Sequence, residues 1–62
     1  MFIEVITIKN EKISLNINNI LNFSPVKVGT RVYMTNEEDF TITEGYEDFK
    51  LRLRRLKSLQ NV

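Results

Sequence analysis

Apolar and polar residues alternate through much of the chain before position 44, as they do in half-buried β-strands. The clearest runs are ISLNI at 13–17, TRVYMT at 30–35 and FTIT at 40–43. FIEVITI at 2–8 carries apolar residues on both of its faces, so we expect a strand placed centrally in the sheet. A fifth short strand is expected at 20–23.

The alternation also predicts which side chains point toward the core. Successive side chains of a strand point to opposite faces of the sheet, so one face of each run is assigned to the interior. The side chains expected to face inward are Ile13, Leu15, Ile17, Val32, Met34, Phe40 and Ile42.

The segments between these runs are short and polar. Lys9–Lys12 and Asn36–Asp39 each separate two β-prone runs, and both are typical of hairpin turns. Asn18-Asn19 marks a further break because asparagine tolerates left-handed backbone. Pro25 ends the strand before it, since proline has no N–H to donate, and Gly29 opens the next strand.

After Thr43 the hydrophobic period changes to that of an α-helix. Tyr46, Phe49, Leu53 and Leu56 form one apolar stripe, which Leu59 extends less perfectly. Acidic residues gather at the start of this segment and basic residues fill the rest, which suits the helix dipole. The sequence therefore predicts one amphipathic C-terminal helix packed on the sheet.

These elements define a small α+β domain that spans residues 1–62. We expect an antiparallel sheet of about five strands in a hairpin meander, with the C-terminal amphipathic helix packed against it. A domain of this size is near the lower limit for a single core, and disulfides, metals or self-association usually support it. Because the chain has no cysteine and no histidine, self-association is the support that remains.

Two segments carry a family resemblance: LNINNI at 15–20 and VYMTNEEDFTITEGYEDFKLRL at 32–53. Their turn, strand and helix-start residues resemble the FlbD-type flagellar and swarming-motility proteins, or related short proteins of phages and mobile elements. Glu37 stands where that family favours glycine, and Gly45 where it favours a capping serine. The resemblance implies the fold, but it carries over no site residue, and a role in motility would rest on analogy alone.

The composition argues against catalysis. The commonest general base and the best nucleophile are missing, because the chain has no histidine and no cysteine. The neighbouring carboxylates of Glu37–Asp39 fall in a solvated turn, whereas a paired-carboxylate site needs a cleft. With only two glycines there is no glycine-rich phosphate loop. We expect no enzyme, no cofactor, no metal and no small-molecule ligand.

Charge is distributed unevenly along the chain. Residues 1–49 hold four basic and eight acidic side chains, a net charge of −4, whereas residues 50–62 hold five basic and none acidic. A helix with this many cations can neutralise phosphates, but a solvated helix face is favoured because acidic residues surround the approach. The alternative function is therefore nucleic-acid binding, with the candidate residues Lys50, Arg52, Arg54, Arg55 and Lys57.

Phe2, Phe23 and Tyr33 are the aromatic side chains that a sheet would offer for base stacking. Only Arg31 beside Tyr33 fits that mode. We therefore expect all three aromatic side chains to pack in the core or at its edge, with Phe2 and Phe23 the more buried.

Leu51 is the one leucine of the helix that lies opposite the core stripe, near 140° when Tyr46 is taken as zero at about 100° per residue. Together with basic neighbours and an outward-facing tyrosine it marks a candidate surface for a protein partner or a second copy. The candidate protein-interaction residues are Tyr33, Leu51, Arg54 and Arg55.

The N-terminal apolar run is too short and too interrupted for a signal peptide or a membrane span, so we expect a cytoplasmic protein. The function predicted is a non-catalytic protein-interaction or regulatory accessory module that can self-associate. The partner itself is not identified by any motif.

Overall fold

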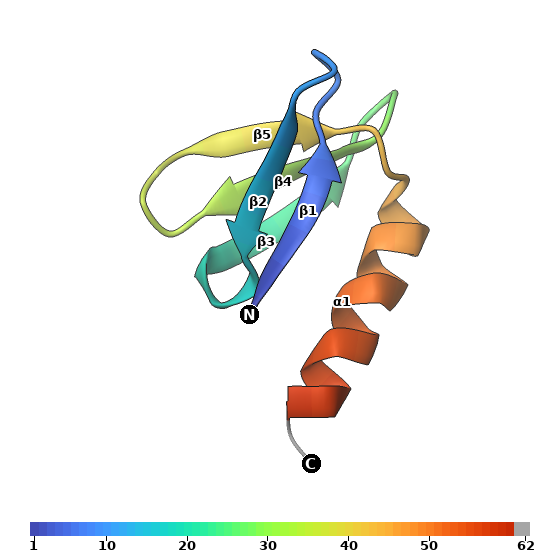
Figure 1. Ribbon diagram of the computed structural model, residues 1–62. Coiled ribbons are helices and arrows are strands. Elements are labelled where there is room, and N and C mark those ends of the chain that lie inside the picture. Colours follow the sequence, from blue (N-terminus) through green and yellow to red (C-terminus); the bar gives the residue numbers. More distant parts are fainter. Residues whose placement is uncertain (61–62) are drawn as a thin grey trace.

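The computed structural model describes the backbone of residues 1–60 and the side chains of residues 1–58. Antiparallel strands precede a single C-terminal helix, which confirms the predicted α+β class (Figure 1). The elements are β1 (Phe2–Ile6), β2 (Lys12–Asn16), the 3-10 turn η1 (Ile17–Asn19), β3 (Ile20–Pro25), β4 (Thr30–Met34), β5 (Asp39–Ile42) and α1 (Tyr46–Gln60).

The five strands are divided between two sheets, β1-β2 and β3-β4-β5. One bridge, Thr7↔Ile42, joins the end of β1 to β5. The expected central position of residues 2–8 is thus only partly realised, because β1 pairs along its length with β2 alone. The division follows from η1: the Asn16 side chain accepts a hydrogen bond from the Asn18 N–H and turns the chain, so that β3 leaves β2.

Both predicted hairpin turns are present. In the first turn the Thr7 N–H donates to the Glu11 carbonyl at 2.8 Å, and Asn10 is left-handed with φ 64°. In the second the Met34 N–H donates to the Glu38 carbonyl at 2.9 Å, and Glu37 is left-handed with φ 70°. Glutamate rarely adopts this conformation, which glycine adopts without cost.

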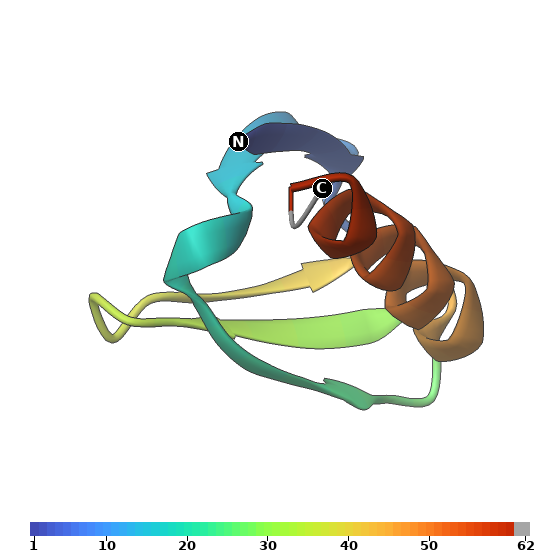
Figure 2. The same cartoon turned by 90° about the horizontal axis from the view of Figure 1, so that it is seen from below.

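The core lies between the two sheets, and α1 lies along the open side between them (Figure 2). The inward faces of all the predicted runs contribute to it, with Ile13 and Phe40 half-buried at its edge. The stripe of α1 contributes Phe49 and Leu53, and Leu56 packs against the edge of the cluster. The predicted extension of the stripe to Leu59 lies outside the described side chains. The fully packed residues are Ile3, Val5, Leu15, Ile17, Val32, Met34, Ile42, Phe49 and Leu53.

Phe2 corrects one prediction. Its side chain is 68% exposed, although the sequence predicted burial. The reason is register: Ile3 and Val5 occupy the inward face of β1, so Phe2 and Ile6 point away from the core. Phe23 is half-buried as expected, with its ring centroid 5.2 Å from that of Phe49 in an edge-to-face contact.

Helix α1 begins directly after Gly45. The Gly45 carbonyl accepts the Phe49 N–H at 2.9 Å, which places this glycine at the N-cap position that the sequence predicted. Glu47 and Asp48 lie in the first turn and Lys57 lies in the last turn that precedes the helix end. This order of charges is favourable to the helix dipole.

Candidate interaction surfaces

The five cations predicted for nucleic-acid contact do not form one surface. Arg52 is committed within the fold: its Nη1 donates to Glu44 Oε1 at 2.9 Å and its Nη2 to the Glu4 carbonyl at 2.9 Å. The bond to the Glu4 carbonyl attaches α1 to β1. Because its guanidinium is already used in this way, Arg52 is a poor candidate for binding phosphate.

Three of the other cations share a shallow groove between α1 and β3. Lys50, Arg54 and Lys57 line it, with a volume of about 410 Å³. Phe23, Leu53 and Ser58 are the remaining lining residues, so no acidic side chain of residues 1–58 lies on its walls. The groove therefore combines a positive rim with an apolar floor.

Leu51 and Arg55 lie on the opposite flank of α1. Leu51 is 45% exposed, as the helical period predicted. It lines a concavity of about 470 Å³ together with Arg55 and Arg52, and Glu44, Asp48 and Leu56 complete the wall. Leu51 and Arg55 are thus brought together, whereas Arg54 belongs to the groove on the other side of the helix.

Tyr33 lies apart from both surfaces, on the outer face of β4. The Arg31 guanidinium stacks over its ring at 5.4 Å from the centroid. Arg31 also donates to Asp39 Oδ2, from Nε at 2.9 Å and from Nη2. This hydrogen bond to a carboxylate raises the pKa of Arg31 above its ordinary value. The Tyr33 ring is therefore already covered in part by its own chain.

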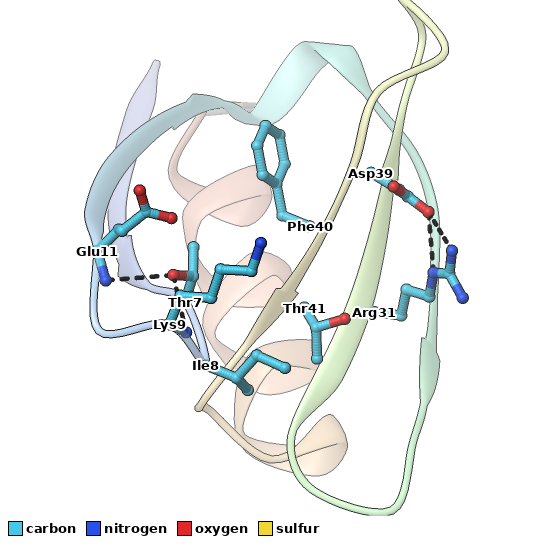
Figure 3. Close-up of a pocket in the computed structure, with 8 residues that line it drawn as sticks. All are labelled: Thr7, Ile8, Lys9, Glu11, Arg31, Asp39, Phe40 and Thr41. Carbon is cyan, nitrogen blue, oxygen red and sulfur yellow. Dashed lines mark hydrogen bonds and ion pairs between the residues drawn. The ribbon is translucent and has the colours of Figure 1, made fainter.

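A further concavity of about 380 Å³ opens where the β1–β2 turn diverges from β5 (Figure 3). Thr7 Oγ1 organises its floor by accepting the N–H groups of Lys9 at 3.3 Å and Glu11 at 3.2 Å. The Arg31–Asp39 pair closes the opposite wall. Both carboxylates of this lining, Glu11 and Asp39, belong to exposed residues.

The outer face of β1 is the surface that sequence reasoning missed. Phe2 and Ile6 are 68% and 44% exposed, and Ile8, just beyond the strand, is 55% exposed. Period-two alternation was present in this run, but both of its faces are apolar, so the pattern did not identify the outer one. We call Phe2, Glu4 and Ile6 the β1 face.

The β1 face and the Leu51 concavity are neighbours. Arg52 lines the concavity and also donates to the Glu4 carbonyl of β1, so the two surfaces meet at this side chain. In Figure 1, β1 and α1 run side by side.

Comparison with family models, with curated proteins and with solved structures finds no match for this chain. The resemblance to FlbD-type proteins consequently stays a prediction. No helix within residues 1–60 is long and apolar enough to cross a membrane. The described residues also contain no group of three or more side chains placed to hold a metal ion.

Proposed function

We propose that the protein is a non-catalytic, cytoplasmic interaction module, which binds a protein partner through the β1 face and the adjoining Leu51 concavity. The observation that carries this proposal is the exposure of two apolar side chains on the outer face of β1, Phe2 at 68% and Ile6 at 44%. Large apolar side chains that are exposed on one strand face are available for contact with another molecule. Aromatic side chains in particular supply much of the energy of protein interfaces.

Arg55 gives this surface a polar rim. It lines the concavity beside Leu51, while Arg52 is neutralised by Glu44 at 2.9 Å. A partner with an apolar centre and an acidic edge would match both features. We propose a regulatory accessory role for the same reason, because a module without catalytic activity of its own acts by binding its partner.

Affinity capture from the source cells tests the proposal. Proteins retained by the wild-type chain should be lost with the double variant Phe2→Ser and Ile6→Ser. Val28→Ser is the matched control, because Val28 is as exposed as Phe2, at 68%, but lies outside the β1 face. Retention of the same proteins by the double variant would contradict the proposal.

Nucleic-acid binding is the second candidate function, and the groove lined by Lys50, Arg54 and Lys57 favours it. Three cations would neutralise about three phosphates, so the logarithm of the binding constant should fall with the logarithm of salt concentration with a slope of about −2.7 on duplex DNA. The aromatic floor is less suitable for stacking, because the Phe23 ring already contacts Tyr46 and Phe49 at centroid distances of 5.5 and 5.2 Å.

A shift assay at several salt concentrations tests this alternative on duplex and single-stranded DNA. The double variant Arg54→Glu and Lys57→Glu should abolish binding, whereas Arg55→Glu, on the other flank of α1, should leave most of it. Absence of binding by the wild-type chain at low salt would eliminate the nucleic-acid function.

A further inference from the structure

Strand β2 has an outer edge that no other strand of residues 1–60 pairs with. The register of the β1–β2 ladder shows which backbone groups lie on that edge. Thr7 N–H bonds to the Glu11 carbonyl, and Ile17 N–H bonds to the Met1 carbonyl. Hydrogen-bonded pairs alternate along an antiparallel ladder. The backbone N–H and C=O groups of the odd-numbered residues of β2 therefore point toward β1. The N–H and C=O groups of Lys12, Ser14 and Asn16 therefore point outward.

The corresponding edge of β1 is already occupied. Its Glu4 carbonyl accepts Arg52 Nη2 at 2.9 Å, and its Ile6 carbonyl accepts the Thr43 N–H at 2.9 Å. The outward carbonyls of Glu4 and Ile6 are thus used within the fold. The even-numbered residues of β2 lie on the edge that is left open.

The outer edge of β3 differs from that of β2. Its ladder is interrupted by a register shift between Ile20 and Asn22, and the strand ends at Pro25, which has no N–H. Bulges and prolines are the devices that keep an edge strand from pairing with another chain. Strand β2, KISLN, has a continuous register and no proline. It therefore has neither of the two devices that protect the edge of β3.

We propose that β2 pairs with β2 of a second copy of this chain, antiparallel and centred on Ser14. The pairing joins the two β1-β2 sheets into one four-stranded sheet, in the order β1-β2-β2-β1. Two-stranded sheets are marginal by themselves, and a third or fourth strand stabilises them. A homodimer about a two-fold axis is also the commonest assembly of small soluble proteins.

The side chains of this edge are self-complementary. With Ser14 opposite Ser14 of the second copy, Lys12 lies opposite Asn16 of the second copy, so no two like charges are directly opposed. Glu4 lies beside Lys12 in the same chain, with the Lys12 Nζ and Glu4 Oε1 atoms 3.9 Å apart, and balances its charge. A second copy therefore meets neither a charge conflict nor a steric one at the centre, where the serines are small.

The pairing rests on the backbone groups of the β2 edge, whereas the proposed function rests on the side chains of the β1 face. Ser14 is a variant site that separates the two. Its N–H points away from β1, so Ser14→Pro removes an outward donor without breaking a bond of the monomer. Residue 13 before it is already extended, as a residue before proline must be.

Size-exclusion chromatography with light scattering, over a series of concentrations of the full chain, tests the proposal. The wild-type chain should be a dimer that dissociates on dilution. Ser14→Pro should be monomeric and folded by circular dichroism, and the control Ser14→Thr, which keeps the N–H, should still dimerise. A wild-type chain that is monomeric at millimolar concentration would overturn the pairing, as would a Ser14→Pro variant that remains a dimer.

Ser14→Lys keeps the test decisive if the proline variant does not fold. Its ammonium would lie beside Glu4 in its own chain, because Glu4 and Ser14 are paired in the ladder. Across the two-fold axis, however, two ammonium groups would face each other. We expect the dimer to weaken at least tenfold and to recover in part at high salt. A dimer that is unchanged by Ser14→Lys but lost in Phe2→Ser would assign the interface to the β1 face instead.

Discussion

The two sheets of this protein contribute to one core but differ in how they are held. In the three-stranded sheet β4 has a partner on each side, and Val32 and Ile42 are 0% exposed. The β1–β2 pair is attached through one bridge, through hydrogen bonds from the Arg52 and Thr43 side chains, and through its inward side chains. Its other face leaves Phe2 68% exposed. Both halves therefore supply buried side chains to the core, and they differ in the number of strands and backbone bonds that hold them.

Two phenylalanines measure this difference most directly. Phe49 is 0% exposed and packs against Phe23, so Phe49→Ala should lower the free energy of unfolding by about 3–5 kcal/mol. Phe2→Ala should change it by less than about 0.5 kcal/mol, because the side chain is already in water. Urea denaturation followed by circular dichroism measures both values. A large cost at Phe2 would show that the β1 face is covered in the folded protein.

Gly29 lies in the connection between β3 and β4, and a substitution there tests how closely this connection packs. Its φ is +89°, and a Cβ placed there would lie 1.9 Å from the Ile42 carbonyl oxygen. Because both the backbone conformation and the close contact exclude a side chain, Gly29→Ala should cost about 2–4 kcal/mol. Gly45→Ser is the control, since the nearest atom to its added Cβ is Asp48 Oδ2 at 3.8 Å. It should gain a few tenths of a kcal/mol as a better N-cap. Thermal unfolding measures both variants. An equal loss of stability at the two sites would contradict the claim that only Gly29 excludes a side chain.

The sequence predicted the elements of both halves but not their division. Alternation at Leu15, Val32 and Ile42 and the helical stripe through Phe49 identify inward faces, because burial imposes those periods locally. The separation into two sheets depends on η1, a turn stabilised by the Asn16 side chain, and on a single long-range bridge. Neither leaves a periodic signal in the chain.

The candidate surfaces were predictable only where the helical period applies. Exposure of Leu51 followed from its angle on the helix, but the separation of Arg54 from Arg55 depends on what packs on each flank of α1. The engagement of Arg52 with Glu4 joins residues 48 positions apart. Contacts of this kind are set by tertiary packing, which local spacing does not contain.

Arg52 joins α1 to β1, the first strand of the two-stranded half. Its bonds to Glu44 Oε1 and to the Glu4 carbonyl are partly exposed, so Arg52→Ala should cost about 1 kcal/mol. Amide hydrogen exchange should accelerate more in β1 than in β4, because only β1 loses a contact. Arg54→Ala, which removes a cation from the groove beside β3, should leave both strands unchanged. Uniform acceleration in β1 and β4 would show that the halves open as one unit.

The smallest expected effect concerns the two hairpin turns, because each turn contains one left-handed residue other than glycine. Asn10 and Glu37 have φ of 64° and 70°, but asparagine accepts this conformation much more readily than glutamate. Glu37→Gly should therefore raise the free energy of unfolding by about 0.5–1 kcal/mol, whereas Asn10→Gly should change it by close to zero. The shift in the urea midpoint measures both variants. Glu37→Gln removes the charge but keeps the backbone restriction, so it should not raise the free energy of unfolding. If Glu37→Gln raised it as much as Glu37→Gly, repulsion among the carboxylates of this turn, and not its backbone conformation, would limit the stability of the three-stranded sheet.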